Sequence, residues 1–250
     1  MDIGFALTVL GLLVVLAGAI AYVILLFVVH GFTYRTWMFH AAVVAGMALA
    51  LVGWLMGGSA PVAVATEILG VAWFLVARRE LRLVGSTRLA LRRGDPMPEF
   101  TASTTDGRAI TREDLIRNAP ALLVLYRGWW CPSSKVQLDE MIESYGQLRA
   151  AGVTVFAGSV DAPAEAEPLQ RHVGDAITIL CDIPTSLLDA IGVRDARGAP
   201  WYDRLLFGAP RGDISMPAAL AIDASGRITF ARRSTRVDDR PRPGEILAEL

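Results

Sequence analysis

The sequence predicts a chain in two parts: about three transmembrane α-helices, then a soluble layered domain of α/β or α+β class. The helices are predicted by an apolar content of 53%, which is high for a soluble globular protein, and by the absence of charge from Ile3 to Val29. The soluble domain is predicted because, beyond residue 94, short apolar runs alternate with segments of helical periodicity.

The transmembrane part is expected to cover residues 1–78, with spans at about 3–29, 37–56 and 61–77. The first run exceeds the roughly 20 residues that a helix needs to cross a bilayer. It is too long for a signal peptide, and no Lys or Arg precedes it. Glu67 falls in the third span; a functional group and a neutral or paired glutamate facing a neighbouring helix both explain it, so it is assigned no role.

A basic linker is expected at residues 79–93. Arginine is concentrated around it, at Arg78, Arg79, Arg82, Arg88, Arg92 and Arg93. Such residues are retained on the cytoplasmic side of a membrane and attract anionic head groups. The chain is therefore predicted to be a multi-pass protein of the cell membrane whose soluble domain faces the cytoplasm.

Charge and cysteine content exclude several classes of function. The net charge of −1 gives no clustered positive field for nucleic acid. Two cysteines are too few for a disulfide scaffold or a closed zinc site, and the three histidines show no metal-binding spacing. No metal and no cofactor are expected.

The soluble domain is expected at residues 94–250. A hairpin at 100–110 and a short helix after Thr111 come first. The strands are then expected at 121–126, 153–160 and 176–181, with a hairpin at 218–231. Helices are expected from 132 to about 148, at 164–172, at 185–191 and at 244–250. Strands alternating with helices predict a layered domain.

Cys131 is the candidate for chemistry, because it directly precedes a predicted helix whose first residue is Pro132. A thiol reacts as thiolate, and the positive end of a helix dipole favours that form. Arg127 and Lys135 are close in sequence and add positive potential. Trp129 and Trp130 supply an apolar surface for a partner or a peroxide substituent. The alternative is a buried structural cysteine that a proline happens to follow.

Three stretches carry a resemblance to a known family. They are Gly94-Asp95-Pro96-Met97-Pro98-Glu99-Phe100 with Asp106-Gly107-Arg108, Tyr126-Arg127-Gly128-Trp129-Trp130-Cys131-Pro132, and Met216-Pro217-Ala218-Ala219-Leu220-Ala221-Ile222-Asp223 with Gly226-Arg227-Ile228. Together they resemble the alkyl hydroperoxide reductase/thiol-specific antioxidant family, the peroxiredoxin-like branch of the thioredoxin superfamily. The resemblance covers nearly all of the soluble part, and the spans have no counterpart in it.

The resemblance implies a thioredoxin-like fold, with a central mixed sheet flanked by helices, in which Cys131 attacks a peroxide or a disulfide. Pro217 matches the cis-proline that faces the cysteine, and Met216 before it would offer its backbone to the bound partner. An X-Pro bond adopts the cis form at modest cost. Pro217 at the start of an edge strand is the alternative.

Two departures from the family pattern bear on mechanism. Many members have Cys-x-x-Cys, whereas this chain has Cys131-Pro132-Ser133-Ser134, so Ser134 stands where the partner thiol would be. Peroxiredoxins also carry Thr or Ser three residues before the cysteine and Pro seven before it; Gly128 and Val124 stand there. The usual peroxide-activating constellation is therefore not evident.

Cys181, at the end of an apolar strand, is interpreted as a buried inert thiol rather than a distant resolving one. The leading hypothesis is a one-cysteine peroxidase that reduces hydroperoxides through Cys131 and is regenerated by an external thiol. The alternatives are thiol–disulfide exchange with a protein disulfide at a Cys-x-x-Ser site, or a membrane-tethered binding module without chemistry. Membrane lipid is the remaining expected partner.

Overall fold

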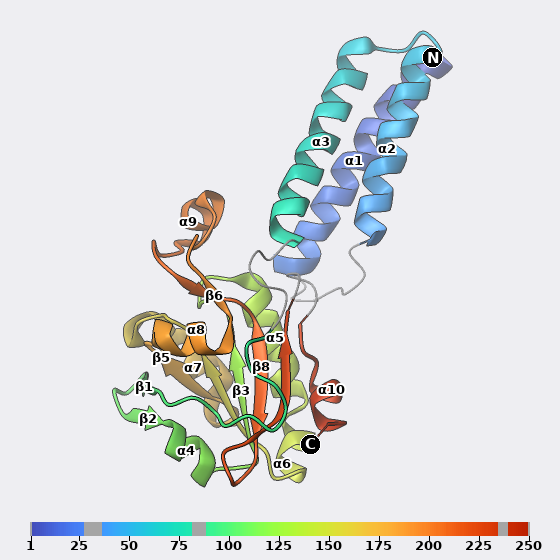
Figure 1. Ribbon diagram of the computed structural model, residues 1–250. Coiled ribbons are helices and arrows are strands. Elements are labelled where there is room, and N and C mark those ends of the chain that lie inside the picture. The colour runs from blue at the N-terminus through green and yellow to red at the C-terminus, as the bar shows by residue number, and fades with distance from the viewer. Residues whose placement is uncertain (1, 28–36, 82–88, 235–239, 250) are drawn as a thin grey trace. The chain divides into compact units, whose positions relative to one another are not determined.

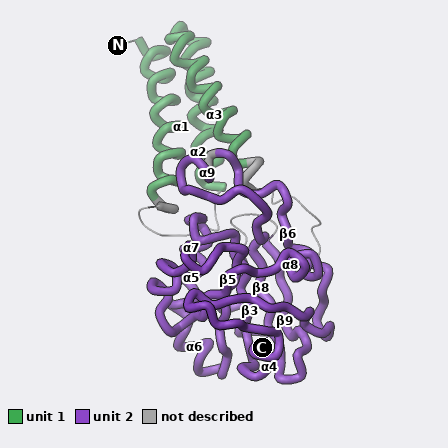
Figure 2. Tube along the Cα trace, turned by 90° about the vertical axis from the view of Figure 1, so that its left-hand side faces the viewer, with its two compact units in different colours: residues 1–82 green, residues 83–250 purple. Residues whose placement is uncertain are grey.

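The computed structural model describes residues 2–27, 37–81, 89–234 and 240–249. These fall into two compact units, an N-terminal unit (Met1–Arg82) and a C-terminal unit (Leu83–Leu250) (Figure 2). Residues 82–88 of the expected basic linker lie outside the described residues.

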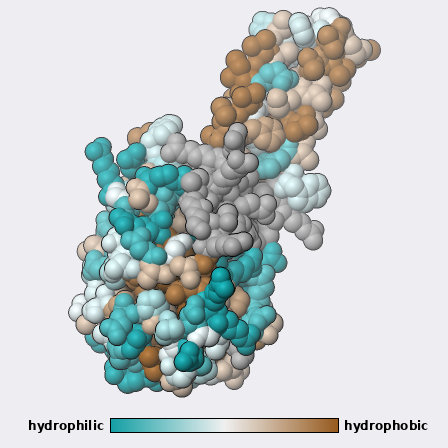
Figure 3. All heavy atoms as spheres, viewed as in Figure 1, coloured by the Kyte–Doolittle hydropathy of each residue, from teal (hydrophilic) through white to brown (hydrophobic). Residues whose placement is uncertain are grey.

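The N-terminal unit consists of three helices, α1 (Ile3–Phe27), α2 (Trp37–Leu55) and α3 (Ala60–Leu81). Each is long and apolar enough to cross a membrane. At most 22% of the most apolar window of any of them is buried, so most of their large hydrophobic side chains face outward. Figure 3 shows these hydrophobic residues gathered over the unit.

Glycines let α1 and α2 approach closely. A Cβ atom on Gly11 would lie 2.5 Å from the carbonyl oxygen of Gly46, and one on Gly53 would lie 2.6 Å from the backbone nitrogen of Thr8. Small residues at helix contacts are characteristic of association in lipid, where van der Waals packing replaces the hydrophobic effect.

The C-terminal unit contains nine named strands and seven α-helices among the residues described. In chain order they are β1 (Thr101–Thr104), β2 (Ala109–Thr111), α4 (Arg112–Arg117), β3 (Ala121–Leu125), α5 (Pro132–Glu143), α6 (Tyr145–Ala150), β4 (Thr154–Gly158), α7 (Pro163–Val173), a 3-10 turn (Gly174–Ala176), β5 (Thr178–Cys181), α8 (Thr185–Ile191), β6 (Arg194–Asp195), α9 (Trp201–Phe207), β7 (Ile214–Ser215), β8 (Ala218–Ile222), β9 (Ile228–Arg233) and α10 (Pro243–Leu247).

The main sheet has the order β2-β1-β5-β4-β3-β8-β9, and β6 pairs with β7 in a separate ribbon (Figure 1). Strands β3, β4 and β5 are parallel, whereas β1, β8 and β9 run antiparallel to their neighbours. The predicted mixed central sheet flanked by helices is confirmed.

Strand β3 lies inside the sheet between β4 and β8, and both of its faces are buried. Leu123 and Leu125 belong to a core cluster shared with α4 and α8, while Leu122 and Val124 belong to a second cluster shared with α5, α7 and α10. A strand covered on both faces reads as a continuous apolar run, which is how it was identified in the sequence.

The sequence expectations differ from the structure in two places. The helix expected from 132 to about 148 is divided into α5 and α6 at Ser144. Residues 194–215, for which the sequence predicted no elements, form the β6–β7 ribbon and α9. We call residues 196–213 the α9 segment.

Candidate functional site

Cys131 lies where the chain leaves β3 and enters α5. It is the N-cap residue of α5, with an extended backbone, and Pro132 is the first helical residue. The backbone N–H groups of Ser134 and Lys135 both donate to the Cys131 carbonyl oxygen, at 3.0 and 3.2 Å. The predicted place of this cysteine at a helix start is confirmed, and its thiol lies in the positive end of the dipole of a 12-residue helix.

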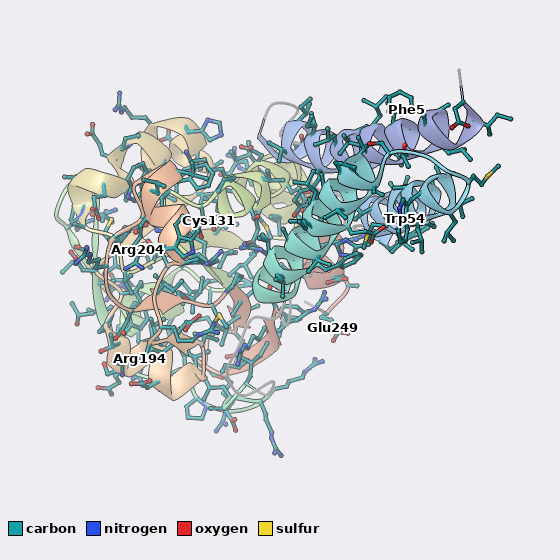
Figure 4. All side chains as sticks on the ribbon, turned by 90° about the horizontal axis from the view of Figure 1, so that it is seen from above. Phe5, Trp54, Cys131, Arg194, Arg204 and Glu249 are labelled. Carbon is teal, nitrogen blue, oxygen red and sulfur yellow. The ribbon has the colours of Figure 1, made fainter. Side chains whose placement is uncertain are left out.

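The thiol of Cys131 is covered. The residue is only 2% exposed and packs in a small apolar cluster with Trp130, Ala199, Ala209 and Ile214, which half-buried Phe207 and Trp129 flank. Four of these six neighbours come from the α9 segment or β7. Figure 4 shows Cys131 among its surrounding side chains. The α9 segment is thus the cover of the site.

A buried ion pair ties this cover to the loop before Cys131. One terminal nitrogen of Arg127 lies 3.5 Å from a carboxylate oxygen of Asp203 in α9, and the two side chains are 7% and 8% exposed. The Arg127 guanidinium also lies 5.1 Å from the centre of a Trp130 ring, a cation–π distance. Trp130 is therefore buried as part of the packing around Cys131, and Trp129 is half-buried.

Ser134 has a structural contact in place of the missing thiol. Its hydroxyl oxygen accepts a hydrogen bond of 3.3 Å from the backbone N–H of Arg127, and the residue is 1% exposed. This bond joins the end of β3 to the first turn of α5. Ser134 therefore helps to fix the loop in which Cys131 lies.

Asp161 holds the same loop from the other side. One of its carboxylate oxygens accepts bonds of 2.7 Å from the backbone N–H of Trp129 and from the Ser159 hydroxyl. The other is buried without a hydrogen-bond partner among the described residues. Burial raises the pKa of Asp161 to about 6, against the hydrogen bonds from Ser159 and Trp129.

Gly128 is where peroxiredoxins carry Thr or Ser, and the structure shows why no side chain fits here. A Cβ atom at this position would lie 2.3 Å from the indole nitrogen of Trp130 and 3.0 Å from an Asp161 oxygen. The packing of Trp130 and Asp161 occupies the space that a threonine would need.

Cys181 is placed unfavourably for chemistry. It ends β5, is 0% exposed, and belongs to the core cluster of α5 and α7 rather than to the cluster of Cys131. Burial, followed by the charges of Asp182 and Asp161, raises the pKa of its thiol to about 12. Both cysteines are free thiols.

One expectation that the resemblance implied for the segment before β8 is wrong: among the described residues the cis peptide bond precedes Pro120, not Pro217. The Met216 N–H donates to the Val193 carbonyl at 2.6 Å, and the Met216 carbonyl accepts from the Ser215 hydroxyl at 3.0 Å. It is Ile214 of β7 that packs with Cys131.

Sequence reasoning missed Asp161 and Asp203. Asp161 directly follows the strand expected at 153–160, and functional side chains gather at the carboxyl ends of parallel strands, so that signal was available. Asp203 lies in a segment without strand or helix periodicity. The local signal for a helix there was Pro200 just before and Gly208 just after the seven-residue helix.

Comparison with known proteins gives a family and a fold. The AhpC/TSA family model matches residues 93–231, more than half of the chain. A sequence comparison with curated proteins gives no significant match.

Three solved structures are similar to the C-terminal part, each with a TM-score of 0.52. They are peroxidoxin BcpB from Mycobacterium tuberculosis (14% identity, 64% of this chain and 96% of that chain covered), Prx3 from Vibrio vulnificus in complex with hydrogen peroxide (21%, 64% and 99%), and a mutant of peroxiredoxin 6 from Arenicola marina (20%, 63% and 70%). At these identities the likeness shows the fold, a thioredoxin-like one. The family model goes further: this chain belongs to the AhpC/TSA family and is a thiol-dependent, peroxidase-like oxidoreductase.

Proposed function

We propose that the protein is a membrane-anchored one-cysteine peroxidase, in which Cys131 reduces a hydroperoxide and an external thiol restores it. The observation that carries this proposal is the contrast between the two thiols. Cys131 lies at the start of α5, whereas burial holds Cys181 as a neutral thiol in another part of the core. One sulfur is thus suited to attack, and the other is suited to neither attack nor resolution.

The first step is a displacement at oxygen. The Cys131 thiolate attacks one peroxide oxygen, an S–O bond forms and the O–O bond breaks. The sulfur is oxidised to sulfenic acid, and the other oxygen leaves as alcohol or water after taking up a proton. One external thiol then condenses with the sulfenic acid and releases water; a second thiol breaks the mixed disulfide and regenerates Cys131.

The cover over Cys131 favours a small substrate over a protein disulfide. A client disulfide must reach the sulfur in line, and a thiol that is 2% exposed beneath Trp130 and Ile214 does not admit one without movement of the α9 segment. Ser134 cannot resolve a mixed disulfide, because it has no sulfur. We therefore rank peroxide reduction above thiol–disulfide exchange and above a binding module without chemistry.

Peroxide titration of the reduced full chain, followed by intact mass, tests the mechanism. Wild type and Cys181→Ala are expected to gain one oxygen atom, and Cys131→Ser none. Loss of two hydrogen atoms from wild type, with no such loss in Cys181→Ala, would instead show a Cys131–Cys181 disulfide and contradict the one-cysteine mechanism. An unchanged mass beside rapid mixed-disulfide formation would favour the exchange reaction.

Membrane anchoring is supported by the outward apolar side chains of α1–α3 and by their glycine-mediated packing. The arginines after the third span support a C-terminal unit on the cytoplasmic side. A reporter that is active only in the cytoplasm, fused after Leu250, is expected to be active. Activity of a reporter that works only outside the cytoplasm, fused at the same position, would overturn this orientation.

A further inference from the structure

The α9 helix carries an exposed apolar face. In the described part of the C-terminal unit, the strongly exposed large hydrophobic side chains are Trp201 at 61%, Leu205 at 74% and Leu206 at 67%. All three belong to this one helix of seven residues. Exposed hydrophobic side chains that cluster on one helix mark a surface that contacts a protein or a membrane.

The exposed face is fixed by the opposite face of the same helix. Asp203 points inward and pairs with Arg127, and Phe207 packs partly buried against the cluster around Cys131. With these two side chains held inside, Trp201 and Leu205, one helical turn apart, are held outside. The exposure therefore follows from how α9 is anchored.

Uncompensated positive charge accompanies these side chains. Arg204 and Arg211 are exposed, and no carboxylate of a described residue pairs with either. Arg197 of the same segment is paired with Asp195, and Arg194, just before the segment, is paired with Asp189 and Asp213. Exposed Trp and Leu beside free arginines match the chemistry of an anionic bilayer surface, where apolar side chains enter and cations meet head groups.

The short linker between α3 and the C-terminal unit favours a bilayer as the partner of the exposed α9 face. Seven residues, 82–88, separate Leu81 of α3 from Leu89, and eight Cα–Cα steps span at most about 29 Å. If α3 crosses a membrane, this tether keeps the C-terminal unit beside that membrane. The local concentration of lipid at α9 is then high, so that even a weak contact becomes populated.

We propose that α9 docks on the anionic surface of the bilayer that holds the chain, with Trp201, Leu205 and Leu206 among the head groups and Arg204 and Arg211 against their negative charge. This inference rests on the membrane anchoring proposed above and is independent of the thiol chemistry. Because the α9 segment also covers Cys131, docking brings the peroxidase site to the bilayer surface.

The test uses the full chain in liposomes, with an environment-sensitive nitrobenzoxadiazole probe on Leu206→Cys in a Cys131→Ser background. Cys181 is 0% exposed and stays unlabelled. The control probe is on Gln147→Cys, an exposed position of α6, which lies at the opposite end of the C-terminal unit from α9 (Figures 1 and 2). The vesicles are pure phosphatidylcholine, or phosphatidylcholine with about one-third anionic phosphatidylglycerol, whose negative surface potential attracts basic residues.

In anionic vesicles we expect the Leu206→Cys probe to brighten several-fold and shift to the blue, while the Gln147→Cys probe stays water-like. Adding Leu205→Gln, or Arg204→Gln with Arg211→Gln, should remove most of that change. A Leu206→Cys probe that stays water-like in chains that float with the vesicles overturns docking but leaves anchoring intact.

Two further outcomes also decide the question. A signal that falls as the protein is diluted at constant lipid composition shows that a second copy covers α9, and this overturns a lipid occupant. Chains that fail to float with the vesicles overturn the anchoring proposal and docking with it; the peroxide titration then still tests the mechanism.

Discussion

Replacing Asp203 with asparagine is expected to uncover Cys131. The change removes the carboxylate that lies 3.5 Å from Arg127 and keeps the size of the side chain. Both partners are largely buried, and removing one member of a buried pair costs about 3 to 5 kcal/mol. The pair joins α9 to the loop of Cys131. Its loss should therefore destabilise the closed position of the α9 segment relative to an open one.

The expected size follows from the lower end of that range, since 3.5 Å is a long contact. If closure weakens by about 3 kcal/mol, the open population rises roughly 150-fold, because each 1.4 kcal/mol is a factor of ten. Reaction of a covered thiol with a reagent in solution follows the open population when opening and closing are fast. Labelling of Cys131 should therefore accelerate by up to two orders of magnitude.

Alkylation by iodoacetamide, followed by intact mass and peptide mapping in the full chain, measures this rate. Cys181, at 0% exposure in the core, serves as an internal reporter of global unfolding. The matched control is Asp213→Asn, which breaks a partly exposed pair with Arg194 on the same segment. Exposed pairs contribute about 0 to 1 kcal/mol, so that variant should label within a few-fold of wild type.

Two results would contradict a role for this ion pair in holding the α9 segment closed. Equal acceleration of Cys131 and Cys181 would show that Asp203→Asn destabilises the whole unit rather than its cover. Labelling of Cys131 at the wild-type rate would show that the ion pair does not hold the α9 segment closed.

Three further outcomes are expected. Burial raises the pKa of Asp161 to about 6, so the folded state binds this proton more tightly than the unfolded state does, and wild type should lose about 2 kcal/mol of unfolding free energy as pH rises from 4 to 6; urea titrations of Asp161→Asn should lack that loss. Gly128→Thr forces a Cβ to within 2.3 Å of Trp130 and should lower the unfolding free energy by about 1 to 3 kcal/mol, whereas Gly146→Thr, which meets open space, should cost less. Ser134→Ala removes the acceptor for a buried backbone N–H and should lower the melting temperature by an amount equivalent to about 1 to 3 kcal/mol, while the peroxide titration still adds one oxygen.

Much of the fold was predictable because its signals are local. The long uncharged runs predicted α1–α3, and the continuous apolar run of residues 121–126 predicted the central strand, since burial on both faces leaves that pattern. Cys131 followed by Pro132 predicted a thiol at a helix start, because proline is suited to the first turn. Each of these follows from neighbours in the chain.

The surroundings of the thiol were not predictable in the same way. No local pattern in the sequence indicates that Trp130 and Met216 are buried. Their burial depends on segments that approach from elsewhere in the chain. The ribbon of β6 and β7 consists of two-residue strands, too short for an alternating pattern. Its position over Cys131 is therefore not encoded in any local signal.

Residue spacing and composition alone indicate which sulfur begins a helix, which stretches are apolar enough for lipid, and which family the soluble part resembles. The tertiary structure alone decided that this sulfur is covered, that Arg127 meets Asp203 in α9, and that Asp161 lies behind the loop with a raised pKa. Burial and charge pairing are properties of residues brought together across the chain, and these set the reactivity of the site.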